Sequence, residues 1–189
     1  MRSDDLHSLP KDLPVPRDDG AAAHLEGLAV PPISLPSTGG RLVRLDDDAG
    51  LVRTVVYAYP RTGLPDRDPA PGFDAIPGAR GCTPQSCAYR DRHAELRRLG
   101  ARVFGLSTQP TDYQTEMAER LHLPFEVLSD EKLELTRALR LPTFEFAGMT
   151  LLRRHTLVIE RGRIVRCFYP VFPPDADAGN VIAYLKDTA

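Results

Sequence analysis

The chain has 189 residues, a length that suits one domain with a sizeable hydrophobic core. Hydrophobic residues make up 42% of it and charged residues 26%, and 24 basic side chains against 26 acidic ones give a formal net charge of −2. These values are ordinary for a globular protein, and without a basic patch in the sequence we expect neither nucleic acid nor a membrane surface as a partner.

The first ten residues are acidic and contain neither a basic segment nor an apolar one, so we expect no secretory signal. No apolar run approaches the roughly 18 residues of a membrane span. The expected location is cytoplasmic, where thiols are kept reduced and a close cysteine pair is more often catalytic than structural.

Residues 1–23 combine prolines and charges without an apolar period, which predicts a mobile N-terminal arm. Residues 24–189 are expected to form a single domain. Its first segments, 28–35 and 41–45, have the pattern of short strands joined by a turn. Residues 52–59 are short, β-branched and nearly all apolar, as a buried central strand is.

The strand ends at Pro60, and a stretch rich in proline and glycine follows to Gly81. Regular structure is not expected there, and long loops of compact domains tend to be functional or mobile. A helix is predicted after Cys82, with Thr83 as its cap, and it is expected to continue until Gly100.

Beyond this helix the sequence alternates strands and helices. The pattern predicts a buried strand, a helix with a capping box at its start, a short strand, and a helix capped by Ser129 or Asp130. An antiparallel hairpin and a closing helix complete the chain. The buried strand, the helix with the capping box and the short strand are predicted at 101–106, 112–121 and 125–128, and the next helix ends near Leu139. The hairpin is predicted at 154–168 and the closing helix at 178–186.

This order predicts the α/β fold class: a mixed central sheet flanked by helices on both faces. It is the order of a thioredoxin-like fold with an N-terminal β-hairpin extension.

The three cysteines are Cys82, Cys87 and Cys167, and two of them are five positions apart. A thiol reacts as its thiolate. Cys82 lies where a helix should begin, and the unpaired N–H groups and positive dipole end there favour an anion. Gly81 allows close approach of the backbone, and Arg80 could add positive charge. The setting suits a reactive thiol.

Cys87 cannot bridge to Cys82 on an intact helix. Five residues rise roughly 7.5 Å along a helix axis, whereas a disulfide needs Cα atoms about 4.4–6.8 Å apart. Either the first turn unwinds when a bond forms, or the segment is not helical. The alternative is a structural role, in which both cysteines are buried as small hydrophobic residues. Metal ligands at suitable spacing are missing from the sequence, so no metal is expected, and Cys167 is interpreted as a core residue.

The segment around the pair, Gly-Cys-Thr-Pro-Gln-Ser-Cys-Ala-Tyr-Arg-Asp over 81–91, resembles the signature of the peroxiredoxin Q (bacterioferritin-comigratory-protein-like) family of redoxins. Tyr59 and Pro60 match the end of the strand before it, and 154–159 is similar to a later strand of that family. The resemblance covers roughly residue 25 to the C-terminus.

The resemblance implies that Cys82 is the peroxidatic cysteine, oxidised by a peroxide to a sulfenic acid. It implies that Cys87 resolves this acid as an intramolecular disulfide, which thioredoxin or a similar dithiol reduces. Arg154 matches an arginine that flanks the thiolate and orients the peroxide oxygens. No metal or organic cofactor is implied.

The family pattern places a threonine three residues before the peroxidatic cysteine and a proline seven before it, but this chain has Ala79 at the first place and no proline at the second. An insertion at about 61–79 separates the strand from the cysteine. We predict that it loops out, so that Pro60 shields the thiolate and Thr62 supplies the missing hydroxyl. Gln85 stands where the family often has glutamate.

The sequence therefore predicts a peroxidase that reduces hydrogen peroxide or alkyl hydroperoxides, as a monomer or weak homodimer. Two alternatives use the same cysteines: a protein dithiol–disulfide exchange module, although the usual C-x-x-C spacing is absent, and a redox sensor with weak peroxidase activity. The inserted loop, with Phe73 and Ile76, is expected to cover a pocket or form a dimer contact.

Overall fold

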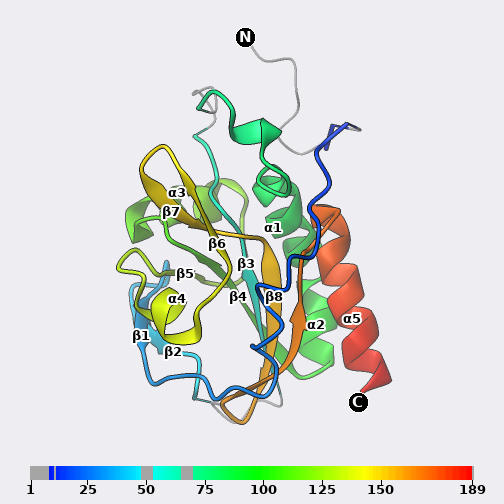
Figure 1. The fold of residues 1–189 in the computed structure, drawn as a ribbon. Helices are drawn as coiled ribbons and strands as arrows, with labels where there is room; N and C mark the ends of the chain where they lie inside the picture. The colour runs from blue at the N-terminus through cyan, green and yellow to red at the C-terminus, as the bar shows by residue number, and fades with distance from the viewer. Residues whose placement is uncertain (1–8, 11, 48–52, 65–69, 189) are drawn as a thin grey trace.

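A computed structural model describes residues 9–10, 12–47, 53–64 and 70–188, and the statements below concern these residues (Figure 1). The core is a five-stranded sheet with the order β5-β4-β3-β8-β9. Its central strand β3 (Arg53–Ala58) runs parallel to β4 (Ala101–Ser107) and antiparallel to β8 (His155–Glu160). The outer strands are β5 (Val127–Ser129), parallel to β4, and β9 (Arg163–Phe168), antiparallel to β8.

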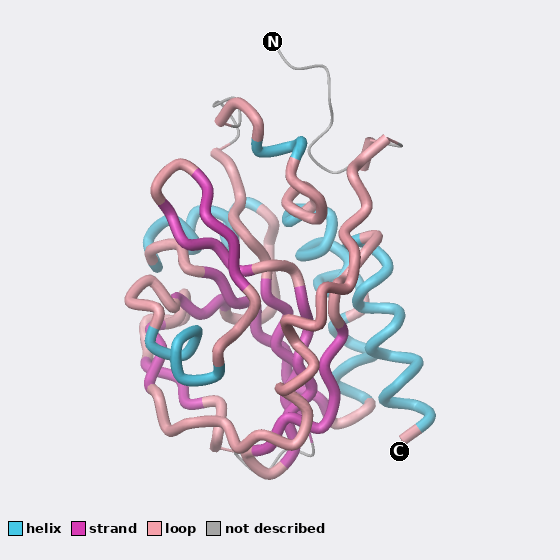
Figure 2. Tube along the Cα trace, viewed as in Figure 1, coloured by secondary structure: helices cyan, strands magenta, loops and turns pink. Residues whose placement is uncertain are grey.

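Side chains of β3 alternate between the two faces of this sheet, as the pleat requires. Val55 and Tyr57 pack into one apolar cluster, and Val56 and Ala58 pack into another. The first cluster includes residues of α1 (Cys82–Asp91), α2 (His93–Arg98), α3 (Thr111–Arg120) and α5 (Asp177–Asp187). The second includes residues of α4 (Glu134–Leu139) and of the N-terminal segments. The predicted mixed sheet between helical layers is confirmed, as Figure 2 shows.

Two small hairpins stand beside the central sheet. The predicted N-terminal one is present as β1 (Ser34–Pro36) and β2 (Leu42–Arg44), shorter than the sequence indicated. The second, β6 (Thr143–Phe146) with β7 (Met149–Leu152), was not predicted from the sequence. Its strands contain aromatic and long apolar side chains that pack on the inserted loop, so a tertiary contact supports a hairpin without a strong local signal.

The described part of the inserted loop is anchored to this second hairpin. Phe73, in the short 3-10 helix η1 (Phe73–Ala75), is 7% exposed, and its ring centroid lies 5.2 Å from that of Phe146. Ala79 and Leu151 complete the small apolar cluster. Within the insertion predicted at about 61–79, residues 65–69 lie outside the described residues.

The predicted mobile arm, 1–23, differs from what the structure shows over residues 12–23. This segment runs along the domain: the Tyr169 hydroxyl donates to the Asp19 carboxylate at 2.7 Å, and Ala22 is buried. Pro16 lies against the loop at Gly78, where an added Cβ would meet its Cγ at 3.3 Å. These contacts give the segment partners that its composition does not reveal. Residues 1–8 and 11 lie outside the described residues.

The helix that carries the cysteines also differs in detail. It begins at Cys82 itself, and Thr83 does not cap it, because the N-cap position is Gly81 with no side-chain hydrogen bond. The single helix predicted up to Gly100 is divided at Arg92 into α1 and α2. Neither Ser129 nor Asp130 is the N-cap of α4, because that position is Leu133, but the Asp130 carboxylate still accepts the backbone N–H groups of two residues in the first turn. None of the described helices is long and apolar enough to cross a membrane.

Candidate active site

Cys82 is the first residue of α1 and is 4% exposed. The preceding Gly81 has φ of 105°, which an L side chain rarely adopts, and an added Cβ would lie 2.6 Å from Cγ of Pro174. Glycine is thus the residue that fits, and it sets the thiol at the N-terminal end of a ten-residue helix. Free backbone N–H groups and the helix dipole favour an anion there.

The Arg154 guanidinium lies beside this thiol. Its Nη2 is 3.2 Å from Sγ of Cys82, and the residue is 3% exposed. Arg154 immediately precedes β8, the strand that pairs with β3, so the sheet places the guanidinium at the start of α1. A buried guanidinium against a sulfur stabilises negative charge on it.

The same guanidinium donates to a series of carbonyls in the loop before α1. Nε donates to the oxygen of Gly78 at 3.3 Å, and Nη2 donates to those of Ala79 at 3.1 Å and Arg80 at 3.2 Å. Nη1 donates to Oε1 of Gln85 on α1. A planar fork with five N–H groups can satisfy this arc of acceptors, which a lysine could not.

Behind Gln85 lies a buried acid. Its Nε2 donates to Oδ2 of Asp177 at 2.7 Å, and the Tyr89 hydroxyl and the Thr156 hydroxyl donate to the same oxygen at 3.0 Å and 2.8 Å. Burial raises the pKa of Asp177, while its three donors and Arg154 act in the opposite direction. Sequence reasoning missed Asp177, because it is 92 positions from Gln85 and belongs to no motif.

Pro60 and Thr62 are both buried, as expected for residues near a shielded site. The Thr62 hydroxyl, however, contacts Oε1 of Gln109 at 3.4 Å, and its backbone N–H donates to the same atom at 2.9 Å. Among the described residues, no hydrogen bond joins Thr62 to Cys82. Its role as the missing hydroxyl stays a prediction, as does shielding by Pro60. At position 79, where the family has a threonine hydroxyl, the backbone carbonyl oxygen of Ala79 lies 3.6 Å from the Cys82 sulfur.

Cys87 lies on the same helix and is partly exposed, and neither thiol is part of a disulfide. Burial raises the pKa of the Cys87 thiol, with Arg90 acting against that effect. Cys167 lies on β9 and packs against the core, and burial raises its pKa to about 12. A thiol with a raised pKa forms little thiolate, and this agrees with the interpretation of Cys167 as a core residue. No cluster of three potential metal ligands occurs in the described part of the chain.

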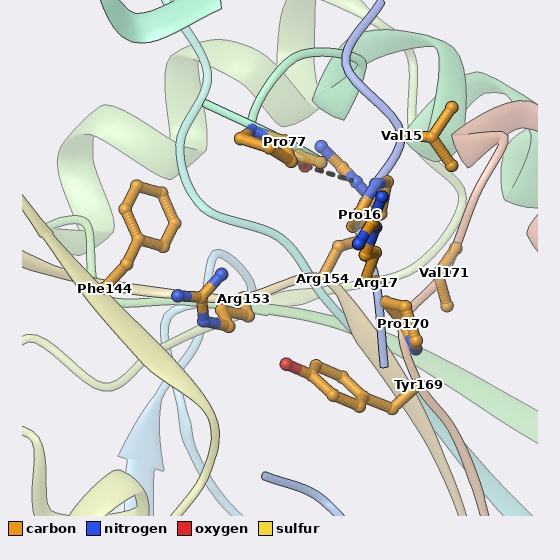
Figure 3. Close-up of a pocket in the computed structure, with 11 residues that line it drawn as sticks. Val15, Pro16, Arg17, Pro77, Phe144, Arg153, Arg154, Tyr169, Pro170 and Val171 are labelled. Atoms are coloured by element: carbon orange, nitrogen blue, oxygen red, sulfur yellow. Dashed lines mark hydrogen bonds between the residues drawn. The ribbon is translucent and has the colours of Figure 1, made fainter. Parts of the chain in front are cut away.

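A cavity of about 290 Å³ opens next to Arg154 (Figure 3). Arg153 lies between Phe144 and Tyr169 in this view, with its guanidinium 5.8 Å from the Phe144 ring centroid. The remaining walls are mostly apolar and come from the N-terminal segment, the inserted loop and the segment after β9. They are formed by Val15, Pro16, Arg17, Pro77, Gly78, Pro170 and Val171.

Comparison with known proteins gives consistent results. The profile of the redoxin family matches residues 25–182. The chloroplastic peroxiredoxin Q of Sedum lineare is 30% identical over 162 residues, which are 85% of this chain and 77% of that protein. A putative chloroplastic peroxiredoxin Q of Oryza sativa subsp. indica is also 30% identical, and the match spans 66% of its length. The crystal structure of peroxidoxin BcpB from Mycobacterium tuberculosis superposes with a TM-score of 0.72 at 24% identity, covering 88% of this chain and 99% of that one.

Proposed function

The chain belongs to the redoxin family, as a relative of the peroxiredoxin Q proteins, and from that premise we propose that it is a thiol-dependent peroxidase with Cys82 as its peroxidatic residue. One observation carries the assignment of the residue. Arg154 is buried with its Nη2 3.2 Å from the Cys82 sulfur, at the start of a helix. Two sources of positive potential thus converge on one thiol.

In the first step the Cys82 thiolate attacks one oxygen of the hydroperoxide. The S–O bond forms as the O–O bond breaks, and the departing oxygen takes a proton to leave as water or an alcohol. The sulfur becomes a sulfenic acid, and the peroxide is reduced by two electrons. Arg154 stabilises the attacking thiolate and the charge that develops on the leaving oxygen.

In the second step Cys87 attacks the sulfur of the sulfenic acid, the S–S bond forms and water leaves. Both cysteines belong to α1, and five residues of helix separate Cα atoms too widely for a disulfide. The first turn of α1 must therefore unwind before the bond closes. An external dithiol such as thioredoxin then returns two electrons and restores both thiols.

The substrate class includes alkyl hydroperoxides as well as hydrogen peroxide. Apolar side chains line the cavity beside Arg154 together with three arginines, and the apolar part of the wall suits an organic substituent. A structural relative of the same fold, the bacterioferritin comigratory protein of Xanthomonas campestris, is described by its alkyl peroxide reduction activity. Dithiol exchange with protein substrates is not favoured, because Cys82 is only 4% exposed. A cytoplasmic location and a monomeric or weakly dimeric state stay predictions from the sequence.

Single-turnover oxidation of the reduced protein tests this function. Wild type, Cys82→Ser, Cys87→Ser and the matched control Cys167→Ser are mixed with hydrogen peroxide and with cumene hydroperoxide. We expect fast thiol loss that only Cys82→Ser abolishes, and a trapped sulfenic acid in Cys87→Ser. Oxidation of the wild type no faster than that of free cysteine would refute the proposal.

A further inference from the structure

The cavity beside Arg154 is lined by two further arginines that the peroxidase steps above do not use (Figure 3). Arg153 comes from the segment before β8, and Arg17 comes from the N-terminal segment that runs along the domain. Among the described residues that line the cavity, none is an aspartate or a glutamate. A hollow with three cations and no acid attracts negative charge, so a ligand with an anionic group fits it.

The Arg153 guanidinium has donors to spare. Its Nε donates to the carbonyl oxygen of Thr143 at 3.1 Å, and its central carbon lies 5.8 Å from the ring centroid of Phe144. These two contacts orient the side chain. In the described part of the chain neither of its Nη atoms has a hydrogen-bond partner, and Arg153 forms no ion pair. An arginine binds a carboxylate through two such N–H groups side by side.

Arg154 offers far less to an anionic group. Its Nε and both Nη atoms already donate to the carbonyl oxygens of residues 78–80, to Gln85 and to the Cys82 sulfur. A carboxylate that enters the cavity therefore finds its donors on Arg153 and Arg17. The other end of the same ligand can then lie against Arg154, the residue that contacts the sulfur.

Two acids follow Arg17 in the chain, but both have other partners. The Asp18 carboxylate accepts a backbone N–H two residues further on, and the Asp19 carboxylate accepts the Tyr169 hydroxyl at 2.7 Å. Neither acid lines the cavity, and Arg153 attracts Asp19 only through space. The positive charge of the two arginines thus remains available to a ligand.

The rest of the wall favours a small organic body. The cavity has a volume of about 290 Å³, at the lower end of the range for ligand pockets, and this size suits a compact ligand. Its apolar side chains include Val15, Phe144 and Val171. Val15 and Arg17 precede residues 25–182, the part of the chain that matches the redoxin family, so this wall adds to the shared fold.

We propose that this cavity selects compact organic hydroperoxides that carry a carboxylate, and that Arg153 and Arg17 are the specificity-determining residues that hold the carboxylate. This inference rests on the peroxidase function proposed above and names its substrate class. The peroxide end lies toward Arg154 and Cys82, and the apolar body lies along the wall between the two ends. The reaction is the first step described above, and the carboxylate takes no part in it.

Two hydroperoxides that differ by one carboxylate test this selection. Cumene hydroperoxide and its para-carboxylate share the same ring and the same peroxide group. In single-turnover oxidation of the reduced full chain, we expect the wild type to react at least about tenfold faster with the carboxylate, as a charge-assisted hydrogen bond allows. Arg153→Gln should lower this ratio of rates to about two or three. Arg17→Gln should lower it less, because Arg17 is exposed.

Arg98→Gln is the matched control, since Arg98 is an exposed arginine at the end of α2 and does not line the cavity. It removes the same charge and should leave the ratio of rates at its wild-type value. Para-isopropylbenzoate, which lacks the peroxide group, gives a readout without chemistry. Calorimetry with Cys82→Ser should show that it binds, and adding Arg153→Gln should weaken this binding by about tenfold. Thermal unfolding establishes that each variant is folded.

Equal rates for the two hydroperoxides in the wild type would overturn the proposal, and so would a folded Arg153→Gln protein that keeps the wild-type ratio. A loss of the ratio that Arg98→Gln shares would also overturn it, because net charge alone would then explain the preference. If the wild type reacted with every peroxide at the rate of free cysteine, the proposed peroxidase function would fail. The binding of para-isopropylbenzoate would still decide whether the cavity holds a carboxylate.

Discussion

Replacing Arg154 with methionine removes the cation beside Cys82 while keeping most of the side-chain volume. The guanidinium lies 3.2 Å from the sulfur and is 3% exposed, so no solvent cation can replace it at that distance. Removal of one preorganised donor from a site of developing charge typically costs a factor of about 10² to 10³ in rate. We expect the reaction of Cys82 with hydrogen peroxide to slow by about 100-fold, or about 2.7 kcal/mol in activation free energy.

The same substitution should also destabilise the fold. The carbonyl groups of Gly78, Ala79 and Arg80 each accept a hydrogen bond from Arg154. If each buried carbonyl that loses its donor costs about 1 kcal/mol, the free energy of unfolding falls by about 3 kcal/mol. Arg154→Lys keeps the charge but cannot reach this arc of acceptors, and we expect a rate loss of about tenfold.

Stopped-flow mixing of the reduced protein with peroxide measures the rate, and urea unfolding measures the stability. Arg166→Met on β9 is the control, because Arg166 is about half exposed and its ion pair with Glu26 is on the surface. A folded Arg154→Met protein that reacts at the wild-type rate would refute the reasoning, since the sulfur would then owe its reactivity to the helix start alone.

Two further predictions concern groups whose pKa the fold shifts. Burial raises the pKa of Cys87, so the rate of disulfide closure, measured by quenched-flow alkylation, should keep rising from pH 7 to 9. A plateau below pH 8 would contradict this. Burial lowers the pKa of His155 to about 4. Below about pH 6.5 the unfolded chain therefore binds a proton at this histidine, whereas the folded chain does not. The free energy of unfolding should therefore fall by about 3 kcal/mol as the pH drops from 6.5 to 4. Urea unfolding of His155→Gln should show a weaker dependence of this free energy on pH. An unchanged dependence would rule out His155 as the cause.

Much of the fold was predictable because its signals are local. The all-buried strand β3 has a short β-branched sequence, and the β8–β9 hairpin has a turn with Gly162 between two apolar segments. The β6–β7 hairpin and the packing of residues 12–23 were not predictable in this way. Both depend on contacts with distant segments, such as Phe73 on Phe146 and Tyr169 with Asp19.

The sequence by itself pointed to the cysteine pair that we propose as reactive: two cysteines in a recognisable motif, with Gly81 before a helix start, and a spacing of five that an intact helix cannot bridge. Only the tertiary structure decided what surrounds that thiol. Hydrogen bonds depend on distance and direction in space, and the sheet brings Arg154 to within 3.2 Å of a sulfur 72 positions earlier in the chain. The same folding places Asp177 behind Gln85 and turns Thr62 toward Gln109, which no spacing along the chain could reveal.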